Sequence, residues 1–438
     1  MMKISEMPKY EVYKDSGVEW IGKIPEHWNL KSLKRVVKEH SGNGFPIELQ
    51  GQAGDIPFLK VSDLSCEGIL VDKSSNRVSH KVVQKQKWNI VPAGSLVTAK
   101  IGEALRKNHR KLLAYDSIID NNCIAFECVK IEKKYNFYLH LVIDFDWFVN
   151  PGAVPSISVS KYKSQKVVVP SMKEQVLIAN FLDKKTALID EAISIKEKQI
   201  NLLKEHKQII IQQAVTQGLD PNVPMKDSGV DWIGKIPAHW ETVRSRWLFK
   251  QRREKARKED EQLTASQKYG VISQQQYMEL EGRRVTQVEF NSEILKHVEA
   301  NDFVISMRSF QGGIEFCPYT GCVSSAYVPL IPNSMVYAPY FKHLLKSSRY
   351  IEALQSTSNL VRDGQALRYE NFCMVDLLIV PEEEQVAIAK YIDDQNSLSE
   401  MSTILLEAQI ERLKEYKTTL INSAVTGKIK ITPEMVEQ

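Results

Sequence analysis

The sequence predicts an α+β protein with an internal pseudo-two-fold repeat, in which a long antiparallel two-helix coiled coil separates two mixed α/β domains. A fifteen-residue phrase at 14–28 returns at 226–240 with thirteen identical positions. A stretch without glycine or proline follows in each copy, at 183–216 and 393–426. Repetition of this kind indicates a tandem duplication.

The leading phrases are the most similar parts of the two copies. They read KDSGVEWIGKIPEHW and KDSGVDWIGKIPAHW, at a constant offset of 212 residues. Their serine-glycine and proline residues are typical of turns. We expect Trp20, Trp28 and the matching Trp232 to pack in a core rather than to stack on bases.

The two middles, residues 29–169 and 241–380, are nearly equal in length and share no visible run. Short strands are predicted in SLVTAKIG (95–102), DFVISMRS (302–309), KVVVP (166–170) and LLIVP (377–381). Glycines at Gly42, Gly44, Gly312, Gly313 and Gly364 mark loops. The leading phrases and the glycine-free stretches are similar in the two copies, whereas the middles differ. This indicates one scaffold that carries two different recognition surfaces, and loops are well suited to recognition.

The glycine-free stretches carry heptad repeats, which are typical of a coiled-coil seam. A flanking stripe at Leu203 and Ile210 accompanies the first repeat, and Ser171 with Glu174 has the spacing of a capping box, so we expect a short helix before each long one. Each long helix could pack on its own domain, but equal length and equal position in the repeat favour a paired rod. The predicted seam consists of Leu188, Ile195, Leu202, Ile209, Leu406, Leu413 and Leu420.

Composition and length place the chain among globular proteins. It has 438 residues, a net charge of +4 and 43% hydrophobic residues, and we divide it into domains at 1–169 and 219–380 with helical spacer regions at 170–218 and 381–438. No apolar run approaches the roughly 20 residues of a membrane span, and no signal peptide is apparent, so a cytoplasmic location is expected. The six scattered cysteines are expected to be reduced thiols, with no metal site.

Three basic clusters stand out against the small net charge. Residues 244–258 hold eight basic residues and one acidic residue, residues 106–111 hold four basic residues, and a third cluster lies at 31–38. Such clusters are often only solvated surface, but three of them favour a surface that faces phosphates. The candidate DNA-binding residues are Arg106, Lys107, Arg110, Arg252, Arg253, Arg308 and Arg362.

No catalytic motif is present. The sequence has no GxxxxGK[ST], no GxGxxG after a strand, no HExxH and no GxSxG. This favours a binding protein over an enzyme, while a structural adaptor that does not touch DNA remains an alternative.

The doubled phrase, the hinge of Pro, Gln and Ile into each helix, and the L-K-E-x-K helices ending in A-V-T resemble the specificity subunit of type I restriction-modification enzymes. The resemblance implies that the two domains are target-recognition domains, each reading one half of a split, asymmetric sequence in double-stranded DNA. It implies that the heptad residues named above form a spacer that sets the gap and docks two modification subunits, which methylate adenine with S-adenosylmethionine. Restriction subunits using ATP and magnesium would cut the DNA. The specificity subunit itself would carry no catalysis, cofactor or metal.

Overall fold

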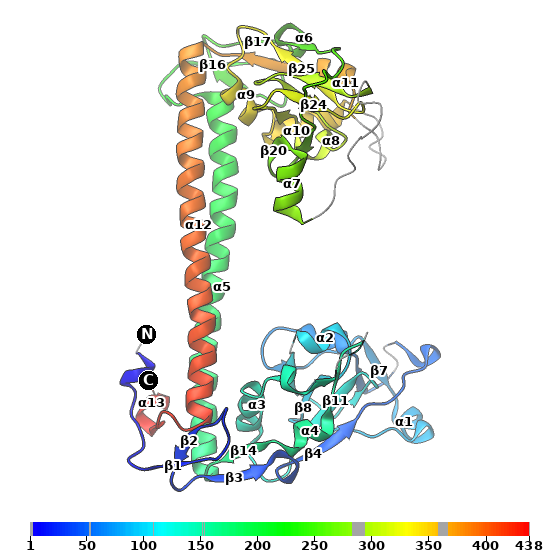
Figure 1. Ribbon diagram of the computed structural model, residues 1–438, viewed down its shortest axis with the longest axis vertical. Helices are drawn as coiled ribbons and strands as arrows, with labels where there is room; N and C mark the ends of the chain where they lie inside the picture. The colour runs from blue at the N-terminus through cyan, green and yellow to red at the C-terminus, as the bar shows by residue number, and fades with distance from the viewer. Residues whose placement is uncertain are drawn as a thin grey trace. The chain divides into compact units, whose positions relative to one another are not determined.

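The structure, a computed structural model, describes residues 3–51, 54–107, 109–150, 152, 154–282, 294–357 and 367–437. The chain forms two compact units, each containing one middle. Unit 1 comprises Met1–Ile195 and Ala408–Gln438, and unit 2 comprises Lys196–Glu407. Figure 1 shows both units and labels some of their helices and strands.

Unit 1 begins with the leading phrase as an antiparallel hairpin of β1 (Tyr13–Asp15) and β2 (Lys23–Pro25). Its middle starts at β3 (Asn29–Ser32) and ends at β14 (Lys166–Val169), and these two strands pair antiparallel. The middle therefore leaves and rejoins the scaffold at one place.

Besides the pair of β12 (Val149–Asn150) and β13 (Ser156–Ile157), the described part of the middle of unit 1 contains one five-stranded and one three-stranded sheet. The larger has the order β4 (Val37–Ser41), β11 (Cys123–Cys128), β8 (Leu96–Ala99), β9 (Arg110–Leu113), β6 (Leu70–Val71). The smaller has the order β10 (Ile118–Ile119), β5 (Ile56–Leu59), β7 (Asn76–Val78). Helix α3 (Lys133–Leu141) follows the sheets.

Unit 2 has the same hairpin and the same closing strand pair as unit 1, but the sheets of its middle are different. The second phrase is the hairpin of β15 (Met225–Asp227) and β16 (Lys235–Pro237), and β17 (Glu241–Arg244) pairs with β26 (Asp376–Ile379). Its main sheet has the order β18 (Phe249–Gln251), β25 (Val328–Pro332), β22 (Phe303–Ile305), β23 (Glu315–Phe316). The strands predicted within 95–102, 166–170, 302–309 and 377–381 are confirmed as β8, β14, β22 and β26.

Around the main sheet of unit 2 lie two further strand pairs and several helices. The hairpin of β19 (Leu263–Ser266) and β20 (Gly270–Ser273) leads into α7 (Gln274–Glu281). Strand β21 (Lys296–Val298) pairs with β24 (Gly321–Val323). The remaining helices are α6 (Ser245–Leu248), α8 (Ser309–Gly312), α9 (Ala338–Leu344), α10 (Ser348–Ser356) and α11 (Tyr369–Cys373).

Two long helices complete the fold. Helix α5 runs from Met172 to Gln217 and α12 from Glu382 to Val425. The prediction of a separate short helix before each is wrong, because nothing in these stretches interrupts the backbone hydrogen bonds. Ser171 and Glu174 do form the capping box, and Gly218 and Gly427 follow the helix ends with left-handed φ angles of 76° and 74°.

The helices pack side by side and antiparallel. In unit 1, Lys417 contacts Asp190 at 2.7 Å, and in unit 2 Lys207 contacts Glu400 at 3.4 Å. Between these pairs α5 advances from 190 to 207 while α12 runs back from 417 to 400. The predicted fold class of mixed α and β with a two-helix coiled coil is confirmed (Figure 1).

Candidate nucleic-acid and partner-binding surfaces

A repeated joint fixes each middle to the helices. In unit 1 the indole N–H of Trp28 donates to Glu174 Oε1 at 3.0 Å, and His27 contacts the same oxygen at 2.9 Å. Burial opposes ionisation of Glu174, but hydrogen bonds from His27, Ser171 and Trp28 outweigh it and hold the pKa of this carboxyl below its ordinary value.

The joint of unit 2 uses the matching residues, but its tryptophan and histidine bind different oxygens of the glutamate. Trp240 donates to Glu384 at 3.0 Å and His239 contacts Glu384 at 2.6 Å. Trp28 is fully buried, as predicted, and Trp240 is fully buried as well. The residue types of the phrase are thus those needed to bind the first turn of a helix.

The C-terminal end of the other long helix also packs at each joint: α12 in unit 1 and α5 in unit 2. Tyr135 donates to the carbonyl of Val425 in unit 1, and Tyr340 donates to the carbonyl of Val215 in unit 2. A Cβ added at Gly427 would lie 2.5 Å from Pro25 Cδ, so the chain passes the phrase too closely for a side chain. Each unit therefore holds the start of one long helix and the end of the other. Neither tyrosine was predicted, because the middles share no run that would align them.

The coiled-coil seam on α5 lies one residue later than predicted. Leu188, Ile195, Leu202 and Ile209 are 49–62% exposed. On α12 the predicted residues are in place, since Leu420 is buried and Leu406 and Leu413 are half-buried. The inward positions of α5 are spaced by four and three residues: Ile189, Ile193, Lys196, Ile200, Leu203, Lys207 and Ile210.

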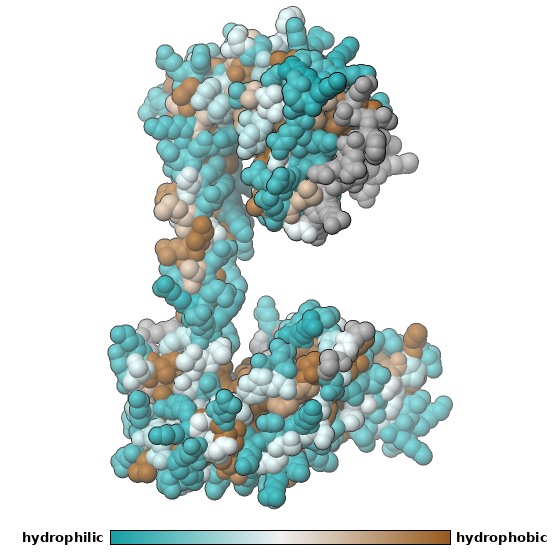
Figure 2. All heavy atoms as spheres, in the orientation of Figure 1, coloured by the Kyte–Doolittle hydropathy of each residue, from teal (hydrophilic) through white to brown (hydrophobic). Residues whose placement is uncertain are grey.

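The displaced stripe remains as an apolar surface on the helices. In unit 2, Leu202 and Ile209 border a shallow groove of about 580 Å³ together with Leu203 and Leu406. Exposed apolar residues on α12 are Leu398, Met401, Ile404 and Leu405. Figure 2 shows apolar side chains gathered on the helical pair. Large apolar side chains repeated on a surface indicate an interaction site.

Arg110 is not a surface residue, which corrects the prediction that it binds DNA. It lies on β9 and is 3% exposed. Its guanidinium packs 3.9 Å from the ring centre of Phe145 and donates to the carbonyl of Ile143. The strand is covered on both faces, so the alternation of strand side chains offers Arg110 no route to solvent.

Arg252 is likewise a structural residue and not a DNA contact. Its guanidinium forms two hydrogen bonds to Asp302, at 2.6 and 3.0 Å, and a third to Glu254 at 2.7 Å. The side chain of Asp302 is only 2% exposed. A buried carboxylate in this geometry requires the cation beside it.

The other described candidates are exposed. Arg106 ends α2 (Glu103–Arg106) and lies 3.7 Å from Glu103, and Lys107 follows it. Arg253 and Arg308 are exposed in unit 2. Arg362 lies outside the described residues.

A polar neighbour of Arg308 escaped the sequence analysis. The amide of Gln267, in the turn between β19 and β20, donates to the carbonyl of Arg308 at 3.1 Å. Lys268 follows it and is exposed. Only pairing of distant segments brings these residues together, so no local pattern could have indicated them.

Two absences hold for the part of the chain that the structure describes. No helix there is long and apolar enough to cross a membrane. No group of three or more histidine, cysteine, aspartate or glutamate residues there has an arrangement that could hold a metal ion.

Comparison with known proteins agrees with this architecture. Residues 25–205 match the family model described as the type I restriction modification DNA specificity domain. A protein of Methanocaldococcus jannaschii assigned as the MjaX type I restriction enzyme specificity subunit is 22% identical over 429 residues, covering 94% of this chain and 96% of that protein.

Two solved structures share the fold. The HsdS subunit from Thermoanaerobacter tengcongensis aligns with 95% of this chain and 100% of its own at a TM-score of 0.54 and 13% identity. A chain from a structural study of assembly and conformational transition in a type I R-M system covers 92% of this chain and 98% of its own, with a TM-score of 0.60 and 14% identity. The resemblance drawn from the doubled phrase is therefore confirmed: residues 25–205 match the type I restriction modification DNA specificity domain, and the chain is similar in sequence and fold to type I specificity subunits.

Proposed function

We propose that this chain recognises DNA for a type I restriction-modification complex and performs no catalysis of its own. Each middle would read one half of a bipartite, asymmetric target, and the helices would set the gap between the halves. The observation that carries the proposal is the repeated joint, in which Trp28–Glu174 and Trp240–Glu384 attach two unlike middles to one pair of helices.

DNA contact is assigned to the exposed candidates. Arg106 and Lys107 would contact DNA from unit 1, and Arg253 and Arg308 from unit 2. Cationic side chains of this kind position a protein on phosphates, whereas arginine and glutamine can also read base edges in the major groove. Gln267, bonded to the backbone of Arg308, makes this pair the favoured base-reading site in unit 2.

Partner docking is assigned to the apolar stripe of α5. Leu188, Ile195, Leu202 and Ile209 recur every seven residues and are exposed. A heptad stripe that stays about half exposed among the described residues suits the apolar face of a further helix. We assign that helix to the modification subunits, which would bring S-adenosylmethionine, while restriction subunits would bring ATP and magnesium.

The spacer role can be tested by changing the length of the helices. Deleting residues 196–202 from α5 and 405–411 from α12 removes one heptad from each at facing positions. Because a helix rises about 1.5 Å per residue and DNA about 3.4 Å per base pair, the preferred gap should shorten by about three base pairs. Methylome sequencing of cells that express the deletion with its partner subunits measures the gap.

A matched insertion of one heptad at the same positions is the control and should lengthen the gap by a similar amount. Methylation at the original gap in both variants would contradict the spacer role. An adaptor that does not touch DNA predicts no salt-sensitive binding of duplex oligonucleotides by the assembled complex. DNA recognition predicts a steep loss of affinity with salt.

A further inference from the structure

Trp20 and Trp232 hold the same position in the two leading phrases and are both half-buried against the core of their own unit, but only the indole N–H of Trp232 has an acceptor among the described residues. The rings of Trp232 and Tyr350 meet edge to face with centroids 5.4 Å apart, and Tyr350, on α10, is fully buried. The indole N–H of Trp232 donates to the carbonyl of Asp376 at 3.1 Å. In the second copy, the indole N–H of this tryptophan is therefore hydrogen-bonded by a residue of its own unit.

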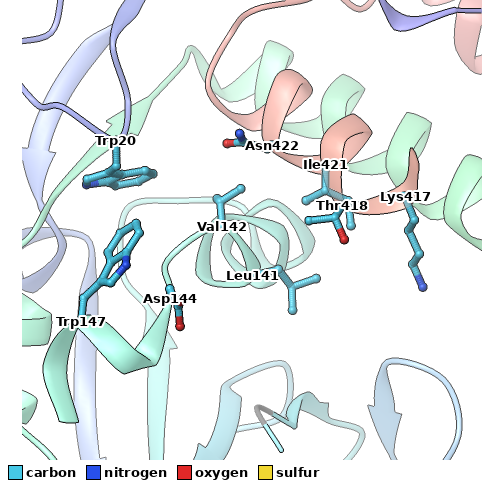
Figure 3. A pocket seen from close by; sticks show the side chains of 9 residues that line it. All are labelled: Trp20, Leu141, Val142, Asp144, Trp147, Lys417, Thr418, Ile421 and Asn422. Carbon is cyan, nitrogen blue, oxygen red and sulfur yellow. The ribbon is translucent and has the colours of Figure 1, made fainter. Parts of the chain in front are cut away.

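In unit 1 the same position borders an open cavity. Trp20 faces Trp147 of η5 (Phe145–Phe148), with ring centroids 5.9 Å apart and planes at 51°. Trp147 is 51% exposed, and the buried indole nitrogen of Trp20 has no acceptor among the described residues. The cavity has a volume of about 630 Å³ and also contacts α12 at Ile421 and Asn422 (Figure 3).

Two exposed carboxylates lie near the indoles, and the buried guanidinium of Arg110, which packs on Phe145, balances one of them, Asp144, only in part. Asp144 lines the cavity, and Asp146 lies next to Trp147 in the sequence; both are exposed. One oxygen of Asp144 accepts from the backbone N–H of Asp146 at 2.9 Å, and no hydrogen bond to the other is found among the described residues. The cation of Lys417 is neutralised by both oxygens of Asp190 at 2.7 Å and lies away from the indoles (Figure 3).

We propose that the cavity bordered by Trp20 and Trp147 binds an arginine side chain of a partner polypeptide. A guanidinium stacks on an indole face through cation–π attraction and can donate to the free oxygen of Asp144 at the same time. Its planar, weakly hydrated shape suits this setting better than the compact ammonium of lysine. Nucleic acid is disfavoured here, because Asp144 and Asp146 would repel phosphates. The site is independent of the proposed DNA contacts.

Fluorine NMR of the full-length chain labelled with fluorotryptophan tests the proposal. Substitutions W20F and W147F assign the two signals among the seven tryptophans. Titration with N-acetylarginine amide should shift both signals saturably. The uncharged isostere N-acetylcitrulline amide should bind at least about threefold more weakly, the ratio expected for loss of a cation–π contact.

Two internal controls sharpen the result. Trp247 is 65% exposed in unit 2, and its signal should not show the saturable shift. D144N keeps an N-cap acceptor before η5 and should weaken arginine binding by roughly threefold through loss of the charge. The proposal is overturned by no saturable shift, by equal binding of citrulline, by an equal response of Trp247, or by unchanged affinity in D144N.

Discussion

At the scale of single residues, Arg252 and Arg253 are neighbours with opposite roles. Arg252→Ala leaves Asp302 as a buried charge without its cation, so we predict a loss of about 3–5 kcal/mol in the free energy of unfolding. Arg253→Ala should change that free energy by less than about 0.5 kcal/mol and lower the salt dependence of DNA binding by about one unit of slope. Urea unfolding and oligonucleotide binding in a salt series measure the two effects. Equal stability of the two variants would contradict the structural role of Arg252.

His297 predicts a pH dependence of stability. Its ring contacts Asp260 at 2.8 Å and Glu299 at 2.9 Å, and its side chain is fully buried. Burial disfavours the cation and Arg257 opposes it as well, but hydrogen bonds to Glu299 and Asp260 outweigh them and raise the pKa of His297.

Because the folded-state pKa is raised, this stabilisation is complete below the unfolded value of about 6.5 and is lost as the pH rises through the folded value. Between these two pKa values the unfolding free energy of the parent should therefore decline, and His297→Gln should make this decline shallower. Urea unfolding at several pH values measures the effect. His206→Gln, at an exposed position of α5, is the control. If His297→Gln has the same pH dependence of unfolding free energy as the parent chain, His297 is not the source of that dependence.

At the scale of elements, the two stripes of α5 predict separable effects. Ile200 is 7% exposed in the seam, so Ile200→Ala should cost about 2–4 kcal/mol of unfolding free energy. Leu202 is 62% exposed, and Leu202→Ala should cost less than about 0.5 kcal/mol. Assembly with modification subunits should instead depend on the exposed stripe, so it should weaken when Leu202 and Ile209 are both replaced by alanine. Chemical unfolding and a pull-down against those subunits separate the two; a stable assembly of the double variant would refute docking on the stripe.

The sequence predicted the two long helices, but neither where they begin nor which of their faces is buried. The heptads predicted the long helices, whereas the attachment of the doubled phrase to their first turns was seen only in the structure. Three of the four α5 repeats, however, have apolar residues at both adjacent positions, as at Leu202–Leu203 and Ile209–Ile210. A period of seven fits either stripe, and the rotation of the helix is decided by tertiary packing around residues such as Ile200. Arg252 was misjudged for a similar reason, because its partner Asp302 is fifty residues away in the sequence.

At the scale of the whole molecule, duplication explains why divergent middles are tolerated. Each middle leaves and rejoins the scaffold on one antiparallel strand pair, β3 with β14 and β17 with β26. The joints to the helices use residues of the constant phrase and hinge, such as Trp28 and Glu174. Recognition residues can therefore change without disturbing the helices, provided that a tyrosine equivalent to Tyr135 or Tyr340 is kept.

Exchange of one middle tests this modularity. Replacing residues 29–169 with the middle of another specificity subunit should change one half of the methylated target and leave the other half and the gap unchanged, because unit 2 keeps its own middle and joint. Methylome sequencing reads both halves in one experiment. A graft that also carries Phe in place of the tyrosine matching Tyr135 is the control for the joint: it should keep the new half-site but lower the unfolding free energy by about 1 kcal/mol, the contribution of one hydrogen bond. A change in both half-sites after the single exchange would show that the middles do not read DNA independently.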